Sequence, residues 1–147
     1  MLYLGADHQG RRLKESVKRT LEKQGVAFRD LDTGRFDPVD DYPLIAARVA
    51  RAVERSSRHS GILLCGSGNG MVMAANRFPK IRAALASAPQ YAAKARTDED
   101  ANILVLPAWW LTVPQASRIV LSWLSTKAEP LKRHRRRQRQ LAQLPRG

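Results

Sequence analysis

Residues 61–76 read GILLCGSGNGMVMAAN, an apolar run that ends in the only cysteine of the chain and continues into a glycine-rich stretch. The run 61–66 is short and bounded by glycine, which predicts a buried strand, and the small residues of 69–76 predict a helix. The stretch therefore indicates a chain that alternates between strands and helices.

The same alternation extends in both directions from this stretch. Further strands are predicted over 2–6, 26–31, 82–87 and 102–106, and further helices between Gly10 and Gly25, from Pro43 onward, over 89–98, and over 112–125 with Thr112 as the N-cap. Five strands alternating with helices predict an α/β fold, a Rossmann-like three-layer sandwich whose five-stranded parallel sheet carries helices on both faces. A length of 147 residues fits one domain over 1–126, followed by a basic C-terminal tail over 127–147.

The formal net charge of +13 is concentrated at the C-terminus, where 127–147 hold eight of the 26 Lys and Arg residues and a single Glu. The densest part is 132-KRHRRRQR-139. Such a block is typical of a nucleic-acid-binding arm, of a solvated and frayed helix end, or of a clamp for a phosphorylated small molecule. Charge alone does not distinguish these three interpretations.

Several features predict a cytoplasmic protein that does not enter a membrane. A single cysteine cannot form an internal disulfide, which suits a reducing compartment. No apolar run approaches the roughly 18 residues that a membrane-spanning helix needs. The first residues, MLYLGADH, lack the basic region of a signal peptide.

Two of the predicted strands end in residues that are able to do chemistry. Asp7 and His8 follow the first strand, and Cys65 ends the third. Ligands of parallel sheets bind beyond the carboxyl ends of the strands, so we expect these residues to share one cleft. On their own, Asp7 and His8 would be read as a helix cap and a surface histidine.

The loop after Cys65 lets the backbone approach a ligand closely, and its amides open onto a helix N-terminus, where anions are stabilised. It is not a nucleotide-binding motif, because a dinucleotide fingerprint needs glycine where Met71 stands and a P-loop needs a lysine that this loop lacks. A ligand site and a plain tight turn both stay open.

Cys65 itself has three interpretations. A free cysteine is most often an inert buried residue. In front of a helix N-terminus its pKa is expected to fall from about 8.5 toward neutrality, which would make a thiolate available as a base. The same thiolate would be a nucleophile if His8 lay across the cleft, as in a thiol–histidine hydrolase.

Other conspicuous residues carry weaker expectations. Met71 and Met73 are expected in the core, and His59 is expected in solvent. For the pair Trp109-Trp110 we expect first a core position, then a dimer interface, then a platform for a sugar.

Taken together, the motifs resemble the ribose-5-phosphate isomerase B family, which also contains the galactose-6-phosphate isomerase subunits. The resemblance runs in order over nearly the whole chain, and its most specific part is Asp-His-x-Gly combined with Cys-Gly-Ser-Gly. The matching pieces are 7-DHQG-10, Leu13-Lys14, Asp41-Tyr42-Pro43, 61-GILLCGSGNG-70, Ala74-Ala75-Asn76, Ile81-Arg82-Ala83, Asp100-Ala101-Asn102, Arg133-His134 and Arg137.

The resemblance implies an aldose–ketose isomerase that works through a cis-enediolate without a metal or an organic cofactor. It implies that Cys65 is the base that moves a proton between C1 and C2, and that Asp7 binds a substrate hydroxyl. It further implies a sugar phosphate as the partner, and a homodimer or dimer of dimers with active sites shared between subunits. The resemblance implies that the oxyanion is bound by Gly66, Ser67, Gly68, Asn69 and Gly70. It implies that the phosphate is bound by His8, Arg133 and Arg137.

Two departures from the family pattern concern substrate handling. Asp98 stands where the family usually has the histidine that helps to open the sugar ring. Trp109 stands where the family commonly has an arginine that helps to hold phosphate. Residues that could replace this cation are Arg11, Lys132, Arg135 and Arg136.

The expected reaction is ribose 5-phosphate to ribulose 5-phosphate, a step of the pentose phosphate pathway. The alternative is the same reaction on another aldose phosphate such as a tetrose 4-phosphate, whose O4 carries the phosphate, so that no furanose forms and no ring-opening histidine is needed. A basic nucleic-acid-binding protein on the same fold is a less favoured alternative, because the charge is confined to the tail and no stacking aromatic residues interleave with it.

Overall fold

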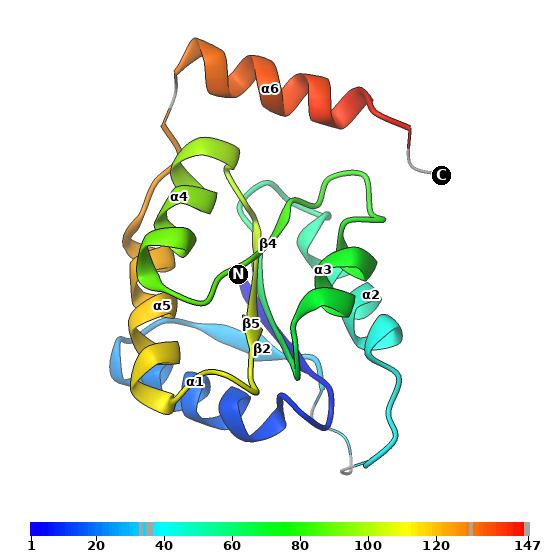
Figure 1. Cartoon of the computed structure of the whole chain (residues 1–147), viewed down its shortest axis with the longest axis vertical. Coiled ribbons are helices and arrows are strands. Elements are labelled where there is room, and N and C mark those ends of the chain that lie inside the picture. Colours follow the sequence, from blue (N-terminus) through cyan, green and yellow to red (C-terminus); the bar gives the residue numbers. More distant parts are fainter. Residues whose placement is uncertain (33, 35–36, 130, 146–147) are drawn as a thin grey trace.

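The computed structural model describes residues 1–32, 34, 37–129 and 131–145 and contains one five-stranded sheet (Figure 1). All strand pairs are parallel, in the order β2-β1-β3-β5-β4. The strands are β1 (Leu2–Ala6), β2 (Phe28–Asp30), β3 (Ser60–Cys65), β4 (Ala83–Leu85) and β5 (Ile103–Pro107). The helices are α1 (Arg11–Lys23), α2 (Tyr42–Val53), α3 (Asn69–Ala75), α4 (Pro89–Glu99), α5 (Val113–Ser125) and α6 (Lys132–Gln143).

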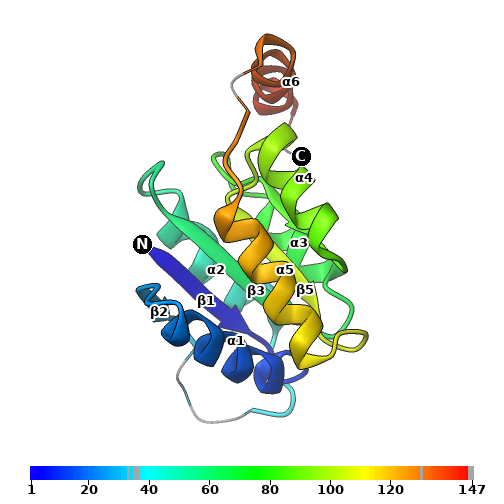
Figure 2. The same cartoon turned by 90° about the vertical axis from the view of Figure 1, so that its left-hand side faces the viewer.

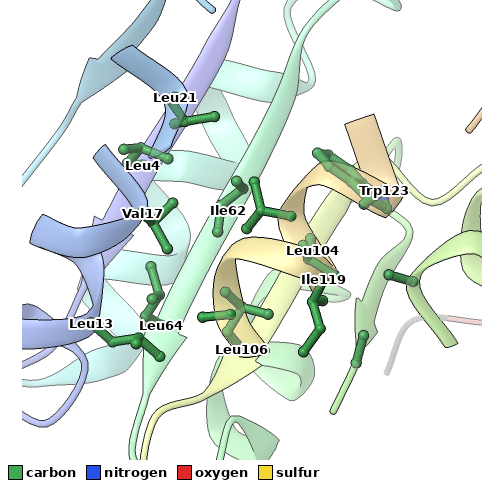
Figure 3. Packing of buried hydrophobic residues seen from close by; sticks show 14 of the residues in the cluster. Leu4, Leu13, Val17, Leu21, Ile62, Leu64, Leu104, Leu106, Ile119 and Trp123 are labelled. Atoms are coloured by element: carbon green, nitrogen blue, oxygen red, sulfur yellow. The ribbon is translucent and has the colours of Figure 1, made fainter. Parts of the chain in front are cut away.

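Two hydrophobic cores lie on the two faces of the sheet, because successive side chains of a strand point to opposite faces. Ile62 and Leu64 of β3 pack with α1, α4 and α5, the core that is drawn in Figure 3. Leu63 and Cys65 of the same strand pack with α2 and α3. Figure 2 views the sheet from the side of α1 and α5, with α2 and α3 behind it. The predicted three-layer α/β sandwich is therefore confirmed.

The connections diverge between β1 and β3. After β1 the chain turns to α1 on one face, whereas after β3 it turns to α3 on the other face. Ligands of parallel sheets bind at such a divergence, beyond the carboxyl ends of the strands. Ala6 pairs with Leu64, and the N–H of Asp7 donates to the carbonyl of Leu64 at 3.2 Å, so Asp7 and Cys65 lie side by side at these ends.

The end of α4 and the C-terminal helix lie at the amino edge of the sheet, where the strands begin. This is opposite the carboxyl edge, where the strands end and Cys65 lies. α4 starts after the carboxyl end of β4 and returns the chain to the amino end of β5. Helix α6 packs against α4, and Figure 1 shows it at the end of the molecule opposite the loop between β5 and α5. The tail is therefore not a frayed end: it forms a regular helix, with His134 as its buried residue.

The predicted strand boundaries differ most from the structure at two strands. β2 covers 28–30 where 26–31 was expected, and β4 covers 83–85 where 82–87 was expected. Both are edge strands with one neighbour each, so their ladders end early. The N-cap at Thr112 is confirmed, since its hydroxyl accepts from the N–H of Gln115 in a capping box. Among the described residues, no helix combines the length and apolar character needed to cross a bilayer.

Candidate active site

The glycine loop wraps around the thiol of Cys65. Gly68 has a left-handed backbone (φ 82°), a conformation that favours glycine, and this turn directs its N–H to Sγ of Cys65 at 3.2 Å. The amide of Met71 acts to lower the pKa of this thiol, as the Gly68 amide does. The hydroxyl of Ser67 accepts the N–H of Asn69 at 3.3 Å. An amide donor thus lies beside the thiol at the end of β3, an arrangement suited to a developing negative charge.

The pKa of Cys65 is raised, which corrects the lowered value predicted from the sequence. Burial of the thiol is the largest cause, and the negative charge of Asp7 adds to it, while the Gly68 amide acts in the opposite direction. The side chain is nearly enclosed, and α3 is only seven residues long. The rise in pKa caused by the loss of water is therefore larger than the fall caused by the helix N-terminus. The neutral thiol is the main form at neutral pH.

Asp7 is a buried carboxylate beside this thiol. Its Oδ1 accepts the N–H of Gly10 at 2.9 Å and so closes the turn before α1. Burial raises the pKa of Asp7, although the Gly10 amide partly offsets this effect. Because Asp7 is held by its own turn, it is a fixed acceptor next to Cys65.

His8 is held by a residue that the sequence analysis did not single out. Asp40, in the loop before α2, accepts the backbone N–H of His8 at 3.0 Å and lies 2.8 Å from the ring Nδ1 through the same oxygen. A carboxylate at Nδ1 keeps the proton on that nitrogen and leaves Nε2 for another partner. No spacing signal could have identified Asp40, because the contact joins segments 32 residues apart. Residues 33 and 35–36 of the same loop lie outside the described residues.

The two tryptophans after β5 are both exposed, so the core position expected first is wrong. Trp109 and Trp110 have 60% and 64% of their surface accessible. Met73 is likewise on the surface, whereas Met71 is buried as predicted. His59 is only half-buried and its Nδ1 lies 3.0 Å from the carbonyl of Ala52.

Asp98 lies at the opposite edge of the sheet from Cys65, near the C-terminal end of α4. Its carboxylate accepts the hydroxyl of Thr97 at 2.8 Å and pairs with Lys94 at 3.5 Å. The Thr97 hydroxyl is the main cause of a lowered pKa for Asp98. Burial does not raise the pKa of Asp98, so the group is not a proton donor. At neutral pH it is an ionised carboxylate and a proton acceptor.

Helix α6 carries both predicted phosphate arginines at this same edge. Arg133 and Arg137 are exposed and four residues apart, so they share one helix face. The Nε of Arg133 donates to Nε2 of the buried His134 at 3.3 Å. Gln138 anchors the helix to α4 by donating to the carbonyl of Asp98 at 3.1 Å.

One group of side chains here has the composition of a metal site: Asp98, Glu129 and His134 offer ligand atoms within 4.8 Å of one another. Nδ1 of His134 is buried and lies 4.0 Å from the Glu129 carboxylate. However, Nε2 accepts from Arg133, so the neutral ring carries its proton on Nδ1. Nδ1 therefore faces the carboxylates as a donor and does not offer a lone pair to a cation.

Within one chain, the residues singled out from the sequence form two groups. Asp7, His8, Cys65 and the glycine loop meet at the carboxyl edge of the sheet. Asp98, Arg133 and Arg137 gather at the amino edge. A single chain therefore does not bring Arg133 and Arg137, two of the three predicted phosphate ligands, to Cys65.

Comparison with known proteins gives consistent matches over almost the entire chain. The family model described as Ribose/Galactose Isomerase matches residues 2–141. Ribose-5-phosphate isomerase B of Mycobacterium tuberculosis is 38% identical over 136 residues, which span 92% of this chain and 84% of that protein.

Solved structures agree. Ribose-5-phosphate isomerase B from Mycoplasma genitalium with bound ribulose-5-phosphate has a TM-score of 0.91 at 35% identity and covers 96% of this chain and 93% of that one. The enzyme from Thermotoga maritima has a TM-score of 0.90 at 38% identity, with 97% of both chains covered.

Proposed function

Because the chain belongs to the ribose/galactose isomerase family and is an aldose–ketose isomerase, we propose that it interconverts ribose 5-phosphate and ribulose 5-phosphate. The observation that carries this proposal is the Gly68 amide that lies 3.2 Å from the Cys65 thiol beside the buried Asp7. A base next to amide donors is what an enediolate intermediate requires.

In the proposed mechanism the thiolate of Cys65 removes the proton from C2 of the open-chain aldose. The electron pair moves to the C1 oxygen, and the cis-enediolate forms. Loop amides stabilise this oxyanion, each by about 3–4 kcal/mol. After a proton has moved between the two oxygens, Cys65 returns its proton to C1 and the ketose forms. Because the pKa of Cys65 is raised, only a small fraction of the side chain is thiolate at neutral pH, but this thiolate is a strong base. The neutral thiol that it becomes is well suited to return the proton.

Asp7 is proposed to bind a substrate hydroxyl, and His8, Arg133 and Arg137 to bind the phosphate. The two edges of the sheet that carry these residues are far apart in one chain, which supports a homodimer, or a dimer of dimers, whose sites join the carboxyl edge of one subunit to the α6 arm of another. The chain then divides into a body over 1–126 and a site-completing arm over 127–147. This gives the basic tail a phosphate as its partner, in place of nucleic acid.

Asp98 is proposed to take part in ring opening as a proton acceptor, since its pKa is lowered by Thr97 and Lys94. A tetrose 4-phosphate, the alternative that would explain Asp98 without any ring opening, is not favoured, because the relatives and solved structures named above are ribose-5-phosphate isomerases. A cytoplasmic location is proposed because Cys65, the single thiol of the chain, must stay reduced to act as a base.

The test is an isomerase assay on four-, five- and six-carbon aldose phosphates with wild-type protein and Cys65→Ala. Ribose 5-phosphate is expected to react fastest, and Cys65→Ala is expected to lower turnover by at least about a hundredfold. Stabilisation of the variant against heat by ribose 5-phosphate should persist, which separates a lost base from a lost fold. Near-normal turnover of Cys65→Ala, or a clear preference for a tetrose phosphate, would overturn the proposal.

A further inference from the structure

A groove lined by arginines lies on the α2 side of the sheet, at the edge that β2 forms. Its volume is about 360 Å³, and its charged lining consists of Arg29, Arg48, Arg51 and Arg55, all of them exposed. Tyr3 and Leu31 belong to the same lining and pack against the core under α2. Arg29 shares their face of the sheet, because it pairs with Tyr3 in the register of β1 and β2 and lies two residues before Leu31. Among the residues that the structure describes, no acidic side chain belongs to this lining.

Two of the four arginines are held in place by the protein, and two are free to bind a ligand. A guanidinium N–H of Arg48 donates to the carbonyl of Leu31 at 3.5 Å, and Cζ of Arg51 lies 5.8 Å from the centroid of the Phe78 ring. Arg29 and Arg55 have no hydrogen bond, ion pair or ring contact with any residue in the described part of the chain. The groove therefore combines oriented cations with unoccupied ones.

The end of helix α2 explains only part of this cluster. Arg51 lies in the last turn of α2 and Arg55 follows it, so both interact favourably with the helix C-terminus. Arg29, on an edge strand, and Arg48, one turn earlier in α2, gain little from that dipole. Four like charges around one small volume repel one another, and a bound anion would relieve the repulsion. The cluster therefore favours a ligand with several negative charges.

Carboxylates flank the groove at both ends, which limits the length of such a ligand. Next to Arg48, a neighbouring hollow is lined by four aspartates of the segment before α2, which are Asp32, Asp37, Asp40 and Asp41. Next to Arg55, the neighbouring hollow mixes its cations with Glu54 and Asp100. A long polyanion such as RNA would have to run past these carboxylates, whereas a short one fits between them.

We propose that this groove binds a small molecule that carries a short chain of phosphate groups, such as a diphosphate or a triphosphate. Guanidinium groups bind phosphate oxygens in pairs, and linked phosphates place several negative charges within the reach of all four arginines. The volume of the groove falls within the range of small-molecule sites, roughly 300–1,000 Å³. Cys65 lies elsewhere, at the end of the central strand β3, so the proposal does not depend on the isomerase reaction.

The test is calorimetric titration with inorganic tripolyphosphate of the full chain carrying Arg133→Ala and Arg137→Ala, which removes the phosphate ligands proposed on α6. In this background, Arg29→Gln with Arg55→Gln is compared with Arg19→Gln and Arg118→Gln. The second pair is a matched control, because Arg19 and Arg118 are exposed on α1 and α5, which cover the opposite face of the sheet. The groove pair is expected to weaken binding at least about tenfold, the worth of one charge-assisted contact. The control pair is expected to weaken it less than about threefold, because salt screens distant charges.

Stability without ligand is the second readout. Thermal unfolding of the groove pair should start no lower than that of the control pair, because two mutually repelling charges are removed. A clearly lower value would show that Arg29 and Arg55 hold the fold, and it would overturn the proposal. Equal tripolyphosphate affinity in the two pairs would also overturn it.

A fluorescent single-stranded RNA oligonucleotide distinguishes a small ligand from a nucleic acid. If the groove pair weakened RNA binding but left tripolyphosphate binding unchanged, the groove would be a nucleic-acid surface and the proposal would be wrong. With the natural residues at 133 and 137, Arg29→Gln and Arg55→Gln should leave the turnover of ribose 5-phosphate unchanged. A loss of turnover would join the groove to the isomerase site and would contradict the proposed separate site.

Discussion

Replacing Gly68 by alanine tests whether the loop amides stabilise the thiolate of Cys65. Alanine disfavours the φ of 82° by about 1–2 kcal/mol, so the loop is expected to change its backbone and to withdraw the N–H that now lies 3.2 Å from Sγ. A hydrogen bond to a charged group contributes about 1.5–3 kcal/mol, and losing it lowers the thiolate population at a fixed pH by roughly ten- to a hundredfold. Turnover near neutral pH should fall by the same factor and recover partly at high pH.

The assay is direct because Cys65 is the only thiol of the chain, so the rate of alkylation as a function of pH reports on this residue alone. Gly25→Ala is the matched control. Gly25 also has a positive φ, of 65°, but no atom lies near the position of an added Cβ, and it follows α1 at the opposite edge of the sheet from Cys65. It should lose less stability, because an added Cβ on Gly68 would also meet the side chain of Leu85, and its thiol should be unchanged. If folded Gly68→Ala protein alkylated with the wild-type pH dependence, the amides would not be stabilising the thiolate.

Because burial raises the pKa of Cys65, turnover should keep rising with pH through and beyond the ordinary thiol range, and a plateau already reached at neutral pH would contradict this. Stability should change in the opposite direction: the contribution of the neutral thiol is present below the pKa of the unfolded chain and is lost as the pH rises through the folded value, as chemical denaturation at several alkaline pH values would show. Asp40→Ala should raise KM for ribose 5-phosphate with little change in kcat, because His8 loses the partner that orients it. Asp37→Ala, whose carboxylate accepts the nearby backbone N–H of Val39, should change neither constant. Mixing inactive Cys65→Ala and Arg137→Ala chains should restore roughly a quarter of the wild-type sites if each site uses two subunits, and no recovery despite subunit exchange would place both residues in one subunit's site.

The alternation of short apolar runs with helical patterns was sufficient to predict the layers of this fold. Hydrophobic periodicity is a local property: Ile62 to Leu64 read as a buried strand and Leu13, Val17 and Leu21 read as one helix face before any tertiary contact is known. The position of Cys65 followed in the same way, because a strand of a parallel sheet ends where ligands bind. The edge strands β2 and β4 were overestimated because their length depends on having a second neighbour, which local sequence does not encode.

Only the tertiary structure decided the chemistry of these residues. The pKa of Cys65 depends on how much water is removed by segments distant in sequence, and this outweighed the helix N-terminus that was visible in the chain. The contact between His8 and Asp40 and the placement of Trp109 over Gly66 likewise join different loops. Sequence patterns determine which residues face the core and which end a strand. Burial, proton affinity and side-chain partners are sums over atoms brought together by the fold, so they become known only with it.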